Sequence, residues 1–290
     1  MFCNLCPRKC NINRDETPGF CGVGNTIKLA RAGLHFWEEP IISGDEGSGT
    51  VFFSGCNLKC VYCQNYDISH EGFGKEITVE RLAQIFKELE ERGANNINLV
   101  TPSHYVNQIV EALKIYRPQI PIVYNTSGYD SVETLKKLEG LVDVYLTDLK
   151  YYSSELSKKY SKAENYFEVA SKAVLEMVRQ QPNNVYNCNG MLTKGVVVRH
   201  MVLPGLMTDS YKVLDWILNN LGAETIVSVM GQYTPYFNVK SYPEINRKLK
   251  PIEYKMVLNH FQKIGLKNGY LQSLDSASEE YIPPFNLEGV

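Results

Sequence analysis

Residues 51–63 read VFFSGCNLKCVYC, an apolar run followed by three cysteines, Cys56, Cys60 and Cys63. Gly55 lets the chain turn back directly before the first of them. Thiolates separated by three and then two residues can hold three irons of a 4Fe–4S cluster and leave the fourth iron open. An open iron suits a second molecule that reacts at the cluster better than it suits plain electron transfer. The stretch therefore predicts a reactive iron–sulfur centre on a loop that follows a β-strand.

Two other interpretations of these cysteines compete with this one. A structural zinc site normally has four closed ligands, and the nearest further candidate, His70, lies beyond residues 64–69. Disulfides need an oxidising compartment, and residues 1–4, MFCN, do not have the pattern of a signal peptide. We therefore favour the iron–sulfur interpretation.

Composition narrows the class of protein further. The chain has 290 residues, 44% of them apolar, and a formal net charge of −2, so it can form a large core but has no strong field for nucleic acid. No apolar run is long enough for a transmembrane helix. Seven of the eight cysteines fall in two tight groups, as in metal sites. We expect a cytoplasmic protein that binds neither nucleic acid nor membranes.

From residue 51 onward, short β-rich runs alternate with helical patterns, which is typical of parallel strands joined by right-handed crossovers. A doubly wound open sheet would have a glycine-rich phosphate turn after its first strand, where this chain has cysteines. We therefore predict an α/β fold, a partial (β/α)6 TIM-like barrel, with reactive groups at the carboxyl ends of its strands. The predicted strands cover 51–53, 97–100, 122–124, 142–146, 196–199 and 226–229, and the predicted helices cover 79–92, 106–116, 131–138 and 209–221. We expect residues 208–210 to cap the last helix and Gly222 to end it.

The cysteine spacing, with Tyr62 directly before Cys63, resembles the signature of radical S-adenosylmethionine (SAM) enzymes. The resemblance implies that the methionine part of SAM binds the open iron and that the reduced cluster cleaves SAM to a 5′-deoxyadenosyl radical. It makes the three cysteines of the motif both cluster ligands and catalytic residues. It also implies a SAM contact for Tyr62 and a partial barrel of the radical SAM type.

Three strand ends are similar to those of pyruvate formate-lyase activating enzymes. Residues 125–128, NTSG, resemble the Asp-Thr-Asn-Gly turn of those enzymes, and residues 148–150, DLK, resemble their Asp-Leu-Lys element. Residues 199–205, RHMVLPG, are similar to their Arg-Tyr-Val-Val-Val-Pro-Gly segment. An arginine within an apolar strand needs a partner, and its planar fork fits a carboxylate. The implied SAM contacts are Asn125, Thr126, Asp148, Lys150 and Arg199.

Two strand ends depart from the family pattern. After the second strand, residues 101–104 read TPSH where the family has a Gly-Gly-Glu segment that binds the SAM amino group. The hydroxyls of Thr101 and Ser103 are the candidate acceptors there. After the sixth strand, the activating enzymes have a Tyr-His pair near adenine, and Gln232 is the candidate at this position.

A second group of cysteines lies at the amino terminus, in a stretch too short to fold on its own apolar residues. The group consists of Cys3, Cys6, Cys10 and Cys21. Four thiolates predict a second metal site, either structural zinc or a fully ligated 4Fe–4S cluster that relays electrons. Cys188 is interpreted as an ordinary loop cysteine.

The chain divides, in this interpretation, into a cysteine-rich extension and a leading strand over residues 1–49, and a barrel with a C-terminal helix and tail over residues 50–290. Between Arg31 and Gly49 we expect an edge strand that packs Phe36 and Trp37 inward. In the alternative interpretation, the aromatic and acidic residues of this segment line the substrate mouth.

The resemblance implies an enzyme whose adenosyl radical removes a hydrogen atom from a glycine of a protein partner, with flavodoxin or ferredoxin as the electron donor. Modification of a small molecule or a peptide by the same chemistry is the alternative. A zinc-stabilised binding scaffold without catalytic activity is the hypothesis from another class of protein.

Overall fold

The computed structural model describes residues 2–271 and 283–290 of the chain. Six parallel strands form the wall of the barrel in the order β9-β8-β6-β5-β4-β2. They are β2 (Ser48–Phe53), β4 (Ile97–Val100), β5 (Ile122–Thr126), β6 (Val144–Asp148), β8 (Leu192–Met201) and β9 (Ile226–Met230). Each contains or overlaps one of the predicted strands, so the partial (β/α)6 barrel is confirmed.

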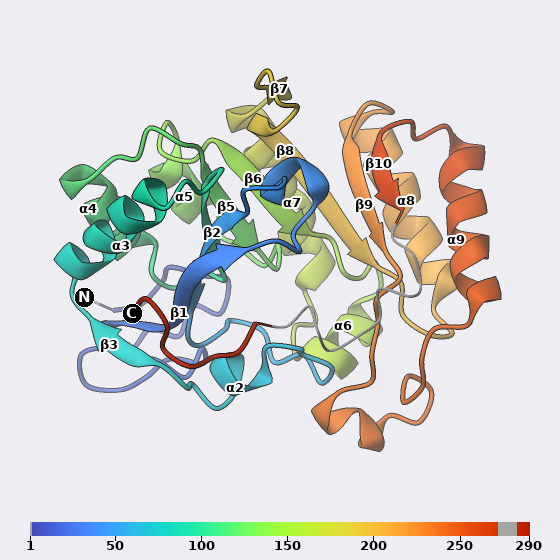
Figure 1. Cartoon of the computed structure of the whole chain (residues 1–290). Coiled ribbons are helices and arrows are strands. Elements are labelled where there is room, and N and C mark those ends of the chain that lie inside the picture. The colour runs from blue at the N-terminus through green and yellow to red at the C-terminus, as the bar shows by residue number, and fades with distance from the viewer. Residues whose placement is uncertain (1, 272–282) are drawn as a thin grey trace.

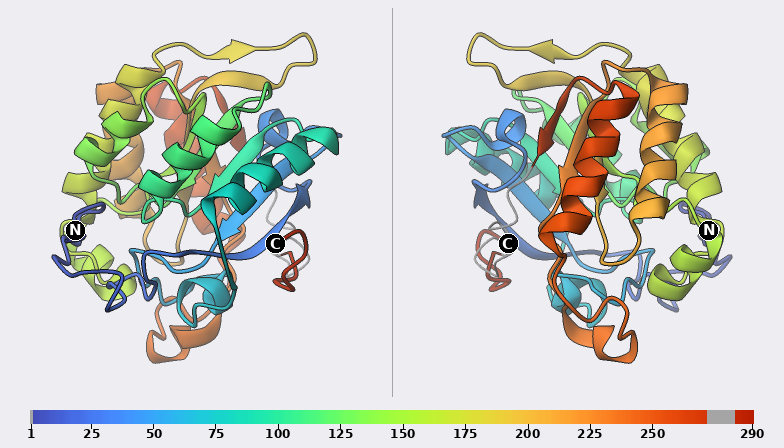
Figure 2. Two further views of the ribbon diagram at one scale, coloured as in Figure 1. Left: turned by 90° about the vertical axis from the view of Figure 1, so that its left-hand side faces the viewer. Right: turned by 90° about the vertical axis from the view of Figure 1, so that its right-hand side faces the viewer.

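Four further strands extend this sheet. β10 (Gly269–Leu271) adds in parallel to β9, and β1 (Ile27–His35) pairs antiparallel with β2. β3 (Lys75–Ile77) pairs with the outer edge of β1, and β7 (Val185–Tyr186) forms a hairpin with β8 that projects beyond the helices (Figure 2). The sheet order runs from β10 to β3 without closing on itself in the described residues.

Helices cover the outer face of the sheet (Figure 1). They are α3 (Val79–Glu91), α4 (Val106–Ile115), α5 (Val132–Leu135) with the 3-10 turn η1 (Lys136–Leu138), α7 (Tyr166–Gln180), α8 (Met207–Leu221) and α9 (Pro251–Ile264). The helix α6 (Ser154–Ser161) lies at the cysteine-loop end, where Ser161 contacts Cys60. The remaining short helices are α1 (Pro40–Ser43), α2 (Tyr66–Ser69) and η2 (Phe237–Ser241). The predicted C-terminal helix is α9, and the tail that follows it lies partly in residues 272–282, outside the described residues.

Local sequence explains most helix ends. Thr78 caps α3, where its hydroxyl accepts a hydrogen bond from the Arg81 amide at 3.2 Å. Gly222 ends α8 with a φ of 93°, as predicted. The predicted cap at residues 208–210 is wrong, because α8 begins at Met207 and the Asp209 carboxylate instead accepts from the amides of Tyr152 and Ser153.

The short helix α1, called the plug below, fills the inner side of the barrel. Ile42 of α1 is fully buried among apolar residues of β5, β6, β8 and β9, including Val123, Val144 and Ile226. Along these strands the residues that contact Ile42 alternate with those that contact the outer helices, such as Tyr124 and Val227. The helix α1 therefore lies inside the barrel, toward the amino-terminal ends of the strands.

No helix in the described part of the chain is both long enough and apolar enough to span a bilayer.

Replacement of Ile42 by alanine is expected to lower the free energy of unfolding by about 2–4 kcal/mol, because it leaves a cavity in a closed apolar cluster. Chemical denaturation measures this change. The matched control is Ile115→Ala on α4, where the side chain is 56% exposed, and it should cost less than about 1 kcal/mol. Equal losses in the two variants would contradict the placement of α1 as a plug.

Candidate active site

The loop with the three cysteines begins where β2 ends. Gly55 has a φ of +84°, and a β-carbon there would lie 2.8 Å from the Cys21 carbonyl oxygen. Only glycine fits this turn without strain. The Cys56 amide also donates to the Cys21 carbonyl at 3.2 Å, so the loop rests directly on the amino-terminal cysteine segment.

The three thiols of this loop are close enough to influence one another. Burial raises the pKa of Cys56 to about 12 and that of Cys60 to about 11, and neighbouring thiols of the loop contribute to both rises. Ser161 contacts the Cys60 sulfur at 3.0 Å, and Ser69 contacts the Cys63 sulfur at 3.2 Å. The thiols are therefore neutral in the protein without metal, and cluster binding would release their protons.

In the described residues, no three cysteine, histidine or carboxylate side chains converge on the position of a single metal ion. A cubane does not need such convergence, because it binds each thiolate through a different iron. An all-sulfur donor set on one buried loop therefore fits a 4Fe–4S cluster better than it fits zinc. Cys56, Cys60 and Cys63 would be the ligands.

A cavity of about 250 Å³ opens next to this loop and extends into the barrel. Most of the residues predicted from the strand ends line it. They are Cys60, Tyr62, Cys63, Asn125, Asp148, Lys150, Arg199 and Gln232. The structure thus brings together side chains from the cysteine loop and from the ends of β5, β6, β8 and β9.

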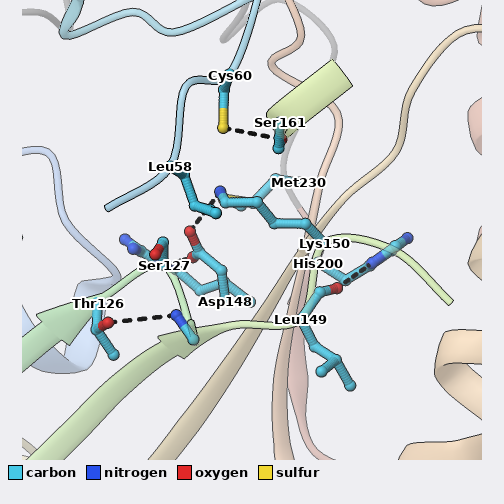
Figure 3. A network of polar contacts seen from close by, with 12 residues as sticks. Leu58, Cys60, Thr126, Ser127, Asp148, Leu149, Lys150, Ser161, His200 and Met230 are labelled. Atoms are coloured by element: carbon cyan, nitrogen blue, oxygen red, sulfur yellow. Dashed lines mark hydrogen bonds and ion pairs between the residues drawn. The ribbon is translucent and has the colours of Figure 1, made fainter. Parts of the chain in front are cut away.

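Buried ion pairs hold the charged residues of this cavity in place. The Asp148 carboxylate accepts from the Lys150 ammonium at 2.6 Å and from Arg199 Nε at 2.8 Å. Arg199 also donates to the Asn125 side-chain oxygen at 2.7 Å. Figure 3 shows the Lys150 side chain reaching Asp148, with Cys60 and its partner Ser161 nearby. The positive charges of Arg199 and Lys150 outweigh the effect of burial and lower the pKa of Asp148, so this carboxylate is ionised.

Three predicted SAM contacts lie outside the cavity lining. Thr101 follows β4 with a left-handed φ of 60° and does not line the cavity. Thr126 faces the helices, where its hydroxyl donates to Asp130 at 2.5 Å, and Ser103 lies beside it at 3.5 Å. The geometry gives these three predictions no support. For Thr126 the reason is strand alternation, since Asn125 faces inward and its neighbour must face outward.

Tyr62 and Gln232 do line the cavity, as predicted. The Tyr62 ring is buried and meets the Tyr233 ring edge-on, with 5.7 Å between ring centres. Its hydroxyl hydrogen-bonds to that of Tyr151. These contacts fix the aromatic ring beside the cysteines.

Sequence reasoning gave the acidic residues at the inner end of the cavity only as an alternative lining of the substrate mouth. Glu38 and Glu39, just before α1, both line it. The expectation that Phe36 and Trp37 pack inward is wrong, because these side chains are 48% and 60% exposed. The strand β1 ends at His35, and the plug turns the carboxylates inward and the aromatic rings outward. The sequence feature that could have indicated these carboxylates is the pair of adjacent acidic residues directly before the apolar α1 segment.

Burial raises the pKa of both glutamates, and the positive charge of Arg199 offsets only part of this rise. Glu38 accepts from Asn125 at 3.2 Å and lies 3.4 Å from the Arg199 guanidinium. Glu39 is 5% exposed, and its Oε2 atom has no hydrogen-bond partner. The inner end of the cavity thus carries more carboxylate than its cations neutralise.

The four amino-terminal cysteines also lie near one another. Burial raises the pKa of Cys6 to about 12, with smaller contributions from the neighbouring thiols of Cys21, Cys10 and Cys3. Arg8 donates to the Asn57 carbonyl at 2.8 Å, between two cysteines of the other group. The segment therefore packs against the cysteine loop. Cys188 is exposed, in the turn between β7 and β8.

Comparison with known proteins identifies the class to which this fold and cavity belong. Residues 50–217 match the Radical SAM superfamily. The match covers more than half of the chain, so the chain belongs to this superfamily, which implies a 4Fe–4S cluster and SAM as cofactors.

Particular relatives share much of the chain. The uncharacterized protein MJ0674 of Methanocaldococcus jannaschii is 34% identical over 91% of this chain and 75% of its own length. The pyruvate formate-lyase-activating enzyme of Clostridium pasteurianum is 26% identical over 73% of this chain and 87% of its own length. The pyruvate formate-lyase 1-activating enzyme of Escherichia coli strain K12 is 25% identical over 55% of this chain and 62% of its own length. The chain is thus similar to the activating enzymes.

Solved structures share the fold. Streptococcus suis SuiB bound to S-adenosylmethionine matches with a TM-score of 0.52 and 14% identity, over 77% of this chain. SuiB bound to the precursor peptide SuiA matches with a TM-score of 0.51 and 13% identity. The chain spans about half the length of these structures, 49% and 48% respectively.

Replacement of Glu39 by glutamine is expected to stabilise the ligand-free protein by about 1 kcal/mol near pH 8. Burial raises the pKa of Glu39, with Glu38, Arg199 and Tyr270 as its charged or titratable neighbours. The folded protein therefore holds the carboxyl proton of Glu39 more tightly than the unfolded chain does, and its stability falls as the pH rises from the unfolded pKa through the folded pKa.

Urea denaturation of both proteins from about pH 5 to about pH 8 measures this difference, which should grow with pH. The control Glu111→Gln, on the exposed side of α4, should show no such trend. A constant difference across the range would contradict the buried, uncompensated state of Glu39.

Proposed function

We propose that this protein is a radical SAM enzyme that cleaves SAM reductively and uses the 5′-deoxyadenosyl radical to remove a hydrogen atom from a glycine of a protein partner. One observation carries the first part of this proposal. Cys60 and Cys63 line the same cavity as Lys150, Asp148 and Arg199, so a cluster site and a site for a zwitterion adjoin.

The roles of the chain's own side chains follow from charge and position. When bound, the cluster and SAM supply the reducing electron and the radical precursor. The Lys150 ammonium and the Arg199 guanidinium would bind the SAM carboxylate, with Asp148 orienting both cations. Asn125, Tyr62 and Gln232 line the remaining wall and would contact the nucleoside. Bound SAM would displace water from this cavity, which protects a radical from stray hydrogen donors.

The choice of a glycyl-radical partner is supported by similarity to the pyruvate formate-lyase activating enzymes. Modification of a peptide or a small molecule is the second candidate, because SuiB was solved with a precursor peptide and shares the fold. Superfamily membership argues against a zinc-held scaffold without activity. A flavodoxin or ferredoxin reductant and a cytoplasmic location stay predictions.

We also propose that Cys3, Cys6, Cys10 and Cys21 hold a second metal centre. Support comes from their mutual proximity and from the contact between the Cys21 carbonyl and the Cys56 amide. A fully ligated cluster at this position would be placed to pass an electron to the cysteine loop, whereas zinc would serve as a structural clasp.

Replacement of Cys60 by alanine is expected to abolish release of 5′-deoxyadenosine and methionine under reducing, anaerobic conditions, because the cluster loses one of three ligands. Chromatography of the products measures this loss. The control Cys188→Ala changes an exposed thiol and should retain wild-type release. Product formation by Cys60→Ala at the wild-type rate would rule out the proposed site.

Replacement of Cys6 by serine is expected to remove the amino-terminal metal and leave about four irons per chain after anaerobic reconstitution. Metal analysis separates the two proposed occupants. A wild-type content of about eight irons indicates a second cluster, and about four irons with one zinc indicates a clasp. A metal content unchanged by Cys6→Ser would contradict the site.

A further inference from the structure

Glu38 and Glu39 have no role in the chemistry assigned above, yet they form the inner end of the cavity. The cavity as a whole is lined by three carboxylates, Glu38, Glu39 and Asp148, and by two cations, Lys150 and Arg199. Burial lowers the pKa of His35 to about 4, so this neighbour adds no positive charge at neutral pH. A buried excess of negative charge is costly unless a cation or a proton neutralises it.

Hydrogen bonds at this end of the cavity are incomplete. The Oε2 atom of Glu39 is buried and has no hydrogen-bond partner, although Glu39 lines the cavity. The Ser228 hydroxyl lies close enough to favour the ionised form of Glu39, but its oxygen also lacks a hydrogen bond of ordinary geometry. Ser228 stands in register with Arg199 on the inner face of the sheet. Buried polar atoms are normally paired, so this end is built to receive a hydrogen-bond donor.

A second cavity of about 690 Å³ meets the first at Trp37, Glu38 and Gln232. Its lining contains Asp45 and Glu46 and, among the described residues, no lysine, arginine or histidine. This acidic groove leads from the surface to Glu38. A groove lined by one sign of charge attracts ligands of the opposite sign.

We propose that the substrate carries an alkylammonium group, which passes along the acidic groove and is bound by the carboxylates of Glu38 and Glu39. This proposal rests on the proposed function, because it assigns the substrate end of the same cavity. The ammonium donates to Oε2 of Glu39 and replaces the missing positive charge. A free amine and a lysine side chain of a peptide or protein share this chemistry.

Charge balance argues against the α-amino group of SAM as the cation at this position. The amino-acid part of SAM belongs at the cysteine end, where Lys150 lies near Cys60. SAM and the cluster also offset each other, with about one net charge of opposite sign each, so they leave the excess carboxylate uncompensated.

Thermal unfolding of the full chain with n-butylammonium chloride tests the proposal at constant ionic strength and without reductant. n-Butanol and sodium butyrate serve as neutral and anionic probes of similar size. We expect a saturable rise in the melting temperature with butylammonium alone. The apparent affinity should fall about tenfold or more in Glu39→Gln, in keeping with the loss of a buried charge-assisted hydrogen bond. The control Glu111→Gln should match the wild type.

Glu38→Gln provides a second variant if Glu39→Gln does not fold, and it should also weaken butylammonium binding. A lysine tripeptide amide that binds more tightly than butylammonium identifies a peptide side chain as the source of the ammonium. Weaker or equal binding identifies a free amine. Either result supports the ammonium site.

The proposal is overturned if butanol stabilises the wild type as much as butylammonium does, or if both glutamate variants bind the amine like the wild type. It is also overturned if equilibrium dialysis shows that Glu39→Gln weakens SAM binding tenfold, because the carboxylate would then serve SAM. Amine binding needs neither cluster nor reductant. Its failure is therefore distinct from failure of the wild type to release 5′-deoxyadenosine, which would overturn the proposed function.

Discussion

The buried ion pair between Arg199 and Asp148 is the constraint on which the site depends. Its side chains are only 15% and 10% exposed, so each charge must be matched within the barrel. Lys150 and Asn125 complete the hydrogen bonds on the side of the cysteine loop, and Glu38 approaches Arg199 from the plug. The Arg199 guanidinium thus links the plug to the strand ends of the barrel. If its ion pair with Asp148 were lost, the charged side chains that line the cavity would no longer be held in place.

The cysteine loop depends on a second constraint, its contact with the amino-terminal segment. Gly55 lies too close to the Cys21 carbonyl for any side chain, and Arg8 holds the Asn57 carbonyl inside the loop. These contacts involve backbone atoms, so they fix the path of the loop whichever metal the segment binds. The amino-terminal cysteines consequently act on the geometry of the cysteine loop as well as on any electron path to it.

Much of the fold was predictable because parallel strands and their crossover helices have distinct periods in sequence. The carboxyl ends of those strands meet at one edge, which is why Asp148, Lys150 and Arg199, chosen from separate strand ends, lie together in one cavity. The resemblance to the activating enzymes pointed to both Asn125 and Thr126 but could not say which of them faces the cavity. Strand alternation decides this, and it turns only Asn125 inward. For Glu38 the sequence offered a place at the substrate mouth only as an alternative, because the direction of this side chain depends on a short helix folded into the barrel and on no periodic pattern of its own.

Charge is ordered along the cavity. Neutral thiols that must become thiolates lie at one end, the cations of Lys150 and Arg199 follow, and the carboxylates of Glu38 and Glu39 lie at the other end. A ligand pair that fills the cavity must reverse this order, with anionic groups near the cations and a positive group beyond them. Either a proton or a cationic ligand must therefore match the carboxylates at that end if every buried charge is to be neutralised.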